Sequence, residues 1–218
     1  MVNSRRMICG RSSRCCMPTA WNSLPGMGRK APTCGWAFRE SLRCTMHWAF
    51  SVQQFALGVP LDAAVRALET AKGVKGRVEV VPTPGTDYTI LIDYAHAPDG
   101  LENVLSSVRG FCKGRLISVF GCGGDRDNTK RPIMGEIGAR LSDIAIITSD
   151  NPRTEDPMKI IDMILAGISD QSNCLVEENR RKAIRMAMDM AQKDDIIVLC
   201  GKGHETYQIL GTEKITSG

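Results

Sequence analysis

The 218-residue sequence contains no uninterrupted apolar stretch of the length that a membrane span or a signal peptide requires. It also contains no G-x-x-x-x-G-K-S/T motif, so it has no P-loop for a nucleoside triphosphate. Paired CxxC knuckles are absent as well, which argues against a zinc site. Because the four cysteines beyond residue 50 are scattered through strand-like or loop segments, we expect a reduced, cytoplasmic protein that contacts no membrane.

The first 50 residues differ in composition from the rest of the chain. They hold eight Arg or Lys against one acid, Glu40, and they include all three Trp and five of the nine Cys. The remaining 168 residues carry 20 basic and 23 acidic side chains, so the formal net charge of +4 comes from this head alone. Neither amphipathic spacing nor interleaved aromatics accompany the charge, so we expect neither a transit peptide nor nucleic-acid binding.

From Pro60 onward, helical and strand-like patterns alternate. Strand patterns occupy 76–81, 88–95, 115–120, 143–148, 174–178 and 195–201. Helical patterns occupy 60–72, a segment from about Asp99, 131–141, a segment from Pro157, and 179–193. Continuous β-branched runs separated by helices predict an α/β, Rossmann-like domain with a mostly parallel sheet and helices on both faces.

Four polar clusters each follow a predicted strand: "DYAHAPD" (93–99), "GCGGDRD" (121–127), "SDNPR" (149–153) and "GKGHE" (201–205). Ligands of open parallel sheets bind at the carboxyl ends of the strands. A single cluster is equally well explained as a solvated loop. Four clusters in phase predict one ligand site at one edge of the sheet.

The residue types in these clusters favour an amino acid or a phosphate as ligand. Arg126 offers a planar fork for a carboxylate or phosphate, whereas "GCGG" alone is weak support for a dinucleotide loop. Glu205 is either a solvated carboxylate or an acceptor for an ammonium group. His96 and His204 either contact a ligand or brace their loops, because no other histidine of the domain is available for a shared metal.

Two further arginines, Arg131 and Arg181, lie in predicted helices. We expect both to be charges on exposed helix faces, as is usual for arginine.

Four motifs carry a resemblance to a known family. "DYAHAPDGLENVL", "VFGCGGDRDNTKRPIMG", "TSDNPRTEDP" and "GKGHETYQ" resemble, in this order and spacing, the C-terminal domain of the Mur ligases. Within the family they resemble the type that adds meso-diaminopimelate, and the resemblance runs from about Phe55 to Ile215. It implies an ATP-dependent ligase of peptidoglycan synthesis that joins meso-diaminopimelate to UDP-MurNAc-L-Ala-D-Glu through an acyl phosphate, with ATP and Mg²⁺ as cofactors.

The resemblance also implies residue roles. It assigns no catalytic residue and no metal ligand to this chain, and it implies that Asp93, His96 and His204 contact a nucleotide or brace loops. The residues that it implies for meso-diaminopimelate binding are Arg126, Asp150, Asn151, Pro152, Arg153, Gly201 and Glu205.

The expected organisation has three parts. Residues 76–218 correspond to the amino-acid-binding C-terminal domain, and 53–75 to a remnant of the central ATPase domain. Residues 1–52 form an atypical basic head, and we hypothesise that it is translated out of frame. A frame that begins at the third base of the Met46 codon reads Ala-Leu-Gly whatever the synonymous codons. Family members have something like "FNVYNALAA" before the "ALGVP" found here at 56–60.

The resemblance leaves two alternatives open for the function. Without a P-loop, the chain is expected to be inactive alone, as a fragment of the ligase. The alternatives are a non-catalytic module that binds an amino acid or nucleotide, and a ligase domain like that of folylpolyglutamate synthetase.

Overall fold

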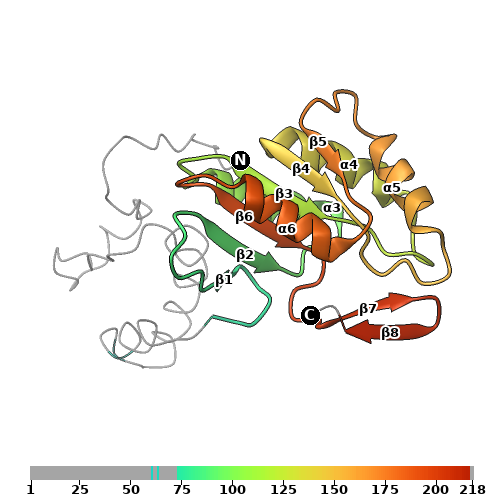
Figure 1. Cartoon of the computed structure of the whole chain (residues 1–218), viewed down its shortest axis with the longest axis horizontal. Coiled ribbons are helices and arrows are strands. Elements are labelled where there is room, and N and C mark those ends of the chain that lie inside the picture. The colour runs from blue at the N-terminus through green and yellow to red at the C-terminus, as the bar shows by residue number, and fades with distance from the viewer. Residues whose placement is uncertain (1–59, 61–62, 64–72, 217–218) are drawn as a thin grey trace, which may run out of the picture. The chain divides into compact units, whose positions relative to one another are not determined.

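The computed structural model describes residues 60, 63 and 73–216 (Figure 1). The chain divides at about residue 70, and the unit Ala71–Gly218 contains all the named helices and strands. The basic head at 1–52 and most of 53–75 lie outside the described residues, as does most of the helix expected over 60–72. Their proposed origins therefore stay predictions.

The second unit is built on a six-stranded sheet. Its strands are β1 (Glu79–Val81), β2 (Thr89–Asp93), β3 (Leu116–Phe120), β4 (Ile144–Ile147), β5 (Cys174–Val176) and β6 (Ile196–Cys200). Their order is β1-β2-β6-β3-β4-β5, and β1 alone runs antiparallel to its neighbour in this sheet. The predicted mostly parallel sheet is confirmed, because every other pairing in it is parallel.

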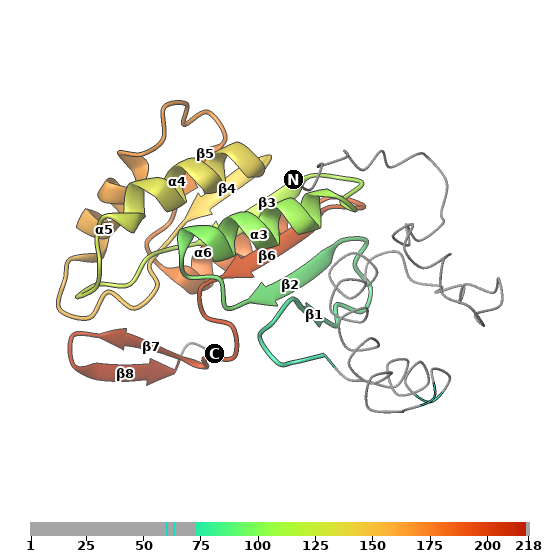
Figure 2. The same ribbon diagram turned by 180° about the vertical axis from the view of Figure 1, so that it is seen from behind.

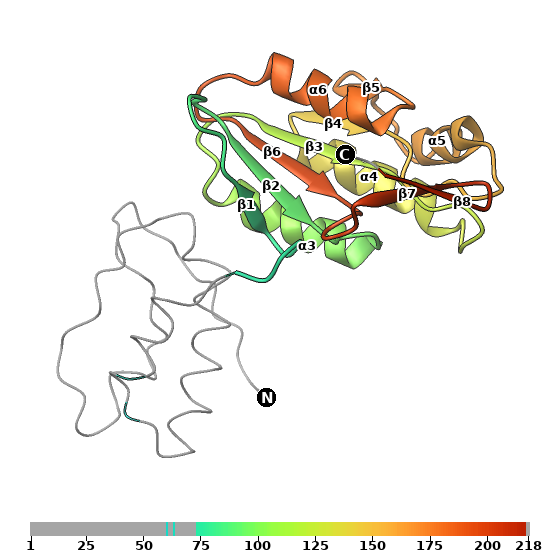
Figure 3. The same cartoon turned by 60° about the horizontal axis from the view of Figure 1, so that its bottom comes forward.

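Helices cover both faces of the sheet (Figures 2 and 3). On one face α3 (Pro98–Arg109) and α4 (Lys130–Leu141) lie side by side, with α5 (Pro157–Leu165) packed against α4; on the other lies α6 (Arg180–Met190). The chain advances across the sheet from β2 to β5 and then returns to β6. Because parallel crossovers are right-handed, a reversal of direction puts the returning helix on the opposite face.

β3 lies near the centre of the sheet, and the burial of its residues agrees with this position. All five of its residues are buried, in keeping with a strand covered on both faces. On the α6 face, Ile117, Val119 and Ile197 pack with Ala183 and Ala187 in one apolar cluster. Small alanines on α6 let this helix pack closely against the sheet.

A short hairpin follows the sheet and was not predicted from the sequence. Its strands, β7 (Tyr207–Leu210) and β8 (Glu213–Thr216), are antiparallel and form a separate two-stranded sheet. The backbone N–H of Arg153 donates to Ile209 O at 3.1 Å, and that of Gly211 donates to Arg153 O at 2.7 Å. The hairpin is therefore bonded to the 149–153 loop through the backbone.

Candidate functional site

The four predicted loops meet at one edge of the sheet. Gly124 N–H donates to Asn151 O at 2.8 Å, which joins the 121–127 loop to the 149–153 loop. The Asn151 side chain donates through Nδ2 to Glu205 Oε2 at 3.3 Å, which joins 149–153 to 201–205. Gly201 N–H donates to Asp93 O at 3.1 Å, which joins 201–205 to 93–99. The predicted convergence is confirmed.

Glycine is required where the 121–127 and 149–153 loops touch. A Cβ on Gly124 would overlap the carbonyl oxygen of Pro152, so only glycine permits this approach. Arg153 Nη1 donates to the Gly124 carbonyl at 2.6 Å. The Asp125 carboxylate in turn accepts from the Thr154 hydroxyl at 2.7 Å and from its N–H at 3.2 Å. These bonds hold the two loops together as one surface.

A buried arginine, Arg131 of α4, connects the same two loops. Arg131 is only 1% exposed, and its guanidinium donates to both carboxylate oxygens of Glu155, at 2.8 and 2.9 Å. It also donates to Gly123 O at 3.2 Å, while Glu155 accepts from Asp125 N–H at 2.5 Å. Hydrogen bonds from Arg131 and then from Asp125 lower the pKa of Glu155.

The expectation that Arg131 is an exposed helix-face charge is therefore wrong. A sequence pattern cannot reveal this role, because the partner Glu155 belongs to a distant loop. Arg181 is exposed on α6, as expected.

A cluster of buried charges lies beside the 149–153 loop. Lys202 is 6% exposed, and its Nζ lies 3.2 Å from Asp150 Oδ1 and 3.6 Å from Glu205 Oε2. The same Nζ donates to Asn151 Oδ1 and, at 2.9 Å, to Tyr207 O. Burial lowers the pKa of Lys202, and the nearby Asp150 carboxylate opposes that shift.

A second buried cation stands near this cluster. Arg180, at the first position of α6, is 6% exposed and donates through Nη2 to Cys200 O at 2.7 Å. Burial lowers its pKa, and the charge of Asp150 raises it. Sequence reasoning missed both Lys202 and Arg180. For Lys202 the available signal was its place between Gly201 and Gly203 in the "GKGHE" cluster.

The turn at Gly201 brings the 201–205 loop against Asp150. Gly201 has φ +103°, a conformation that residues with a side chain rarely adopt, and an added Cβ would lie 3.2 Å from Asp150 Oδ2. Both conditions favour glycine, which explains this residue without a direct ligand contact.

Two guanidinium groups at this edge have no carboxylate partner among the described residues. Arg153, half-buried and at φ +53°, bonds only backbone carbonyls through its side chain. Arg126 is exposed, and the one bond of its side chain goes to Asp125 O at 3.3 Å. Across the 149–153 loop, the Glu205 carboxylate is 18% exposed. The edge thus presents cations for an anionic group and one carboxylate for an ammonium.

The predicted residue Asp93 contacts backbone on both sides. Its Oδ2 accepts from Val78 N–H at 2.8 Å and its Oδ1 from Ala95 N–H at 2.8 Å. These bonds tie the segment before β1 to the loop after β2. Both oxygens are engaged, which is the arrangement expected of a bracing residue.

The two predicted histidines flank one tyrosine ring. The ring of Tyr94 lies 4.8 Å from that of His96 in an edge geometry and 5.7 Å from that of His204 in a stacked one. The guanidinium of Arg77 lies 5.1 Å from the Tyr94 ring centre. Both imidazoles are exposed, so this group offers aromatic faces and a cation beside the 201–205 loop.

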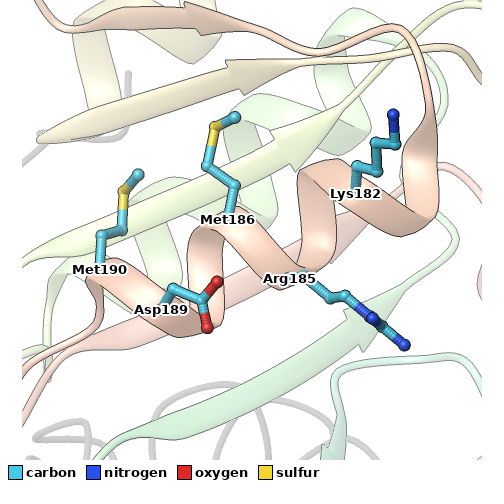
Figure 4. A pocket seen from close by; sticks show the side chains of 5 residues that line it. All are labelled: Lys182, Arg185, Met186, Asp189 and Met190. Atoms are coloured by element: carbon cyan, nitrogen blue, oxygen red, sulfur yellow. The ribbon is translucent and has the colours of Figure 1, made fainter.

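A shallow hollow elsewhere on the surface is lined by residues of α6 (Figure 4). Within the part of the chain that the structure describes, no second element supplies a group to it. The residues that line it are Lys182, Arg185, Met186, Asp189 and Met190.

Among residues 60, 63 and 73–216 there is no group of three acidic, histidine or cysteine side chains placed to hold a metal ion. In the same described part of the chain, no helix is long and apolar enough to cross a membrane.

Comparison with known proteins agrees with this architecture. Residues 76–203 match the family described as Mur ligase, glutamate ligase domain. The chain belongs to the Mur ligase family. The chain is 58% identical over 159 residues to the UDP-N-acetylmuramoyl-L-alanyl-D-glutamate-2,6-diaminopimelate ligase of Clostridium botulinum, covering 72% of this chain and 33% of the relative. The ligase of the same description from Thermosynechococcus vestitus is 55% identical over 161 residues, covering 73% and 32%.

Solved structures give the same result for the fold. A structure of a ligase with that description has a TM-score of 0.62 and 38% identity, covering 76% of this chain and 34% of its own. The folylpolyglutamate synthase/dihydrofolate synthase of Yersinia pestis shares only the fold, with a TM-score of 0.50 and 21% identity. The alternative of a folylpolyglutamate-synthetase-like ligase is therefore not favoured. The chain spans about a third of the length of the relatives it matches.

Proposed function

We propose that this domain recognises meso-diaminopimelate for a ligase that joins it to UDP-MurNAc-L-Ala-D-Glu in peptidoglycan synthesis. The observation that carries the proposal is that the edge holds two guanidinium groups, Arg126 and Arg153, with no carboxylate partner among the described residues, and also the carboxylate of Glu205. The names of the relatives that are 55–58% identical supply the substrate class.

The charges of the site match an amino-acid centre. A guanidinium binds a carboxylate through two parallel hydrogen bonds, and a carboxylate binds an ammonium. Arg153 would bind the carboxylate at the distal end of meso-diaminopimelate, and Glu205 the ammonium beside it. Asn151, linked to Glu205 at 3.3 Å, would add a donor, with Asp150, Pro152 and Gly201 forming the supporting surface.

The same arrangement explains a preference over L-lysine. L-lysine has an ammonium at its distal end but no carboxylate there. Bound in the same way, it would leave the Arg153 guanidinium without its anion in a half-buried position. Sites built to bond a polar group discriminate against ligands that lack it, by about 10⁴ in favourable cases.

Activation of the substrate carboxylate needs a phosphoryl donor, which ATP with Mg²⁺ supplies in ligases of this family. We propose that both are bound mainly outside residues 76–218, because the chain has no P-loop motif and its described residues have no acidic cluster for a metal. Asp93, His96 and His204 would contact the nucleotide or brace their loops. On this basis the 218-residue chain does not ligate alone. We also propose that it acts in the cytoplasm without a nucleic-acid or membrane partner.

The test is a titration of the purified chain, labelled with ¹⁵N, with meso-diaminopimelate and separately with L-lysine. Saturable shifts confined to 121–127, 149–153 and 201–205 are expected for meso-diaminopimelate, with affinity for L-lysine at least tenfold weaker. Arg153→Ala should remove this preference, whereas Arg181→Ala, an exposed arginine on α6, should retain it. Equal affinities for the two amino acids in the unmodified chain would refute the proposal.

A further inference from the structure

We propose that Lys202 is a positioning residue that orients the Asn151 carboxamide, so that this side chain presents an N–H donor and not an oxygen acceptor to the bound amino acid. The orientation itself needs no ligand, whereas its role in recognition rests on the function proposed above.

The hydrogen bonds of Asn151 define its orientation. Its Oδ1 accepts from two donors, the Lys202 ammonium and the backbone N–H of Ile209, the latter at 2.9 Å. An amide NH₂ group cannot accept a hydrogen bond from either donor. If the carboxamide were reversed, its NH₂ group would face the Lys202 ammonium and the Ile209 N–H, and both hydrogen bonds would be lost. The NH₂ group is therefore turned toward Glu205, 3.3 Å away.

Lys202 is itself held in place by the groups around it. Its Nζ donates to Asn151 Oδ1 and, at 2.9 Å, to Tyr207 O, and it lies 3.2 Å from the carboxylate of Asp150, so groups from two segments surround it. The side chain is 8% exposed, which shields these bonds from competing water. A cation fixed in this way keeps the carboxamide of Asn151 in one state before a ligand arrives.

The charge of Lys202 also separates the roles of two neighbouring carboxylates. Its Nζ lies closer to Asp150, at 3.2 Å, than to Glu205, at 3.6 Å, and the Asp150 side chain is 8% exposed against 18% for Glu205. Asp150 is thus the buried partner of the lysine. Glu205 remains the more accessible carboxylate, and it is available to bond an ammonium.

The consequence is a defined pattern of groups at the site. Asn151 offers N–H to a carboxylate or carbonyl oxygen, and Glu205 beside it offers oxygen to an ammonium. An amino-acid centre carries both of these groups on one carbon. In the absence of the lysine, only Ile209 N–H would favour this orientation, so the carboxamide would flip more often and the discrimination would weaken.

The experiment compares Lys202→Met with the unmodified chain by NMR of the Asn151 side-chain NH₂ group, without any ligand. In the unmodified chain, the signals of the NH₂ group should be shifted away from those of an exposed asparagine, and the Ile209 amide should be protected from exchange. Lys202→Met should move the NH₂ signals toward those of an exposed asparagine and lower the Ile209 protection at least tenfold. The control, Lys159→Met on the exposed side of α5, should change neither.

A second variant guards against loss of folding. Lys202→Met with Asp150→Asn removes the buried cation and its closest anion together, so no uncompensated charge is left between them. The same loss of Asn151 order is expected. An ordered carboxamide and a protected Ile209 amide in either folded variant would overturn the inference.

Titration with meso-diaminopimelate gives the functional outcome, with affinity expected to fall at least tenfold in both variants. If the unmodified chain does not bind the amino acid, the proposed function fails, while the ligand-free spectra still decide the orienting role of Lys202. Unchanged affinity in the variants, with binding in the unmodified chain, would refute the role in recognition.

Discussion

Arg131 and Glu155 form a two-pronged ion pair beneath the site, with both guanidinium Nη atoms bonded to carboxylate oxygens at 2.8 and 2.9 Å. The arginine belongs to α4 and the carboxylate to the loop before α5. Since Glu155 also accepts from Asp125, this one pair holds the loop of Arg126 and the loop of Arg153 at a fixed separation.

Arg131→Met is expected to destabilise the domain by about 2–3 kcal/mol. This loss is smaller than that expected on breaking a fully buried ion pair, because the side chain of Glu155 is 33% exposed. Chemical denaturation would measure the loss. Arg181→Met, which removes an exposed arginine, should change the free energy of unfolding by less than about 0.5 kcal/mol. Equal effects of the two variants would show that the pair does not stabilise the loops.

The stability of the domain should fall as the pH drops below about 4, the region of an ordinary Asp pKa. Burial raises the pKa of Asp195, but hydrogen bonds from the Arg115 side chain and backbone and from Gln192 N–H outweigh it, so the pKa is lowered. A carboxyl group with a lowered folded-state pKa stabilises the fold above its unfolded pKa. That stabilisation is lost as the pH falls through the folded pKa.

The measurement is the free energy of unfolding between pH 3 and pH 7, for the unmodified chain and for Asp195→Asn. The variant should be less stable at pH 7 and show a flatter dependence on pH, since its side chain does not ionise. Asp189→Asn on the exposed face of α6 serves as the control and should keep the slope. If the free energy of unfolding of Asp195→Asn keeps the same dependence on pH, other groups are responsible for that dependence.

Gly201→Ala should cost more than Gly85→Ala, although both glycines have positive φ. At Gly85, φ +84°, an added Cβ has no neighbour within 4 Å, so the cost is backbone strain of about 1–2 kcal/mol. At Gly201 the Cβ also meets Asp150 Oδ2 at 3.2 Å. We expect weaker meso-diaminopimelate binding only in Gly201→Ala. If Gly201→Ala and Gly85→Ala bound meso-diaminopimelate with similar affinity and had similar free energies of unfolding, the predicted crowding at Asp150 would be wrong.

Asn151→Asp should weaken meso-diaminopimelate binding as much as Asn151→Ala. Aspartate retains an oxygen for Lys202 and for Ile209 N–H, and it keeps the shape of the side chain. It replaces the NH₂ donor by a second oxygen facing Glu205, where like charges repel. Calorimetric titration of both variants measures the effect. Binding by Asn151→Asp close to that of the unmodified chain would show that the ligand needs no donor here.

Local patterns in the sequence were sufficient for most of the sheet and its helices. β4 is a continuous apolar run and β3 is apolar except for Ser118. Asp156 with Pro157 marks the start of α5 through an N-cap bond from Met158 N–H at 2.9 Å. The hairpin β7–β8 was missed, although "YQILGTEKIT" has two short runs around Gly211 and Thr212. Its strands are largely exposed, so their apolar pattern is weak.

The sequence by itself determined the α/β class, the mostly parallel sheet and the meeting of four polar loops at one edge, because each follows from short-range periodicity and from the direction of parallel strands. Only the tertiary structure decided that Arg131 is buried on Glu155 and that Lys202 bonds Asn151. These pairs join residues 24 and 51 positions apart, and their geometry depends on how helices and loops pack. An isolated lysine or arginine in a sequence carries no sign of the partner that packing will bring to it, so its role appears only when the fold is complete.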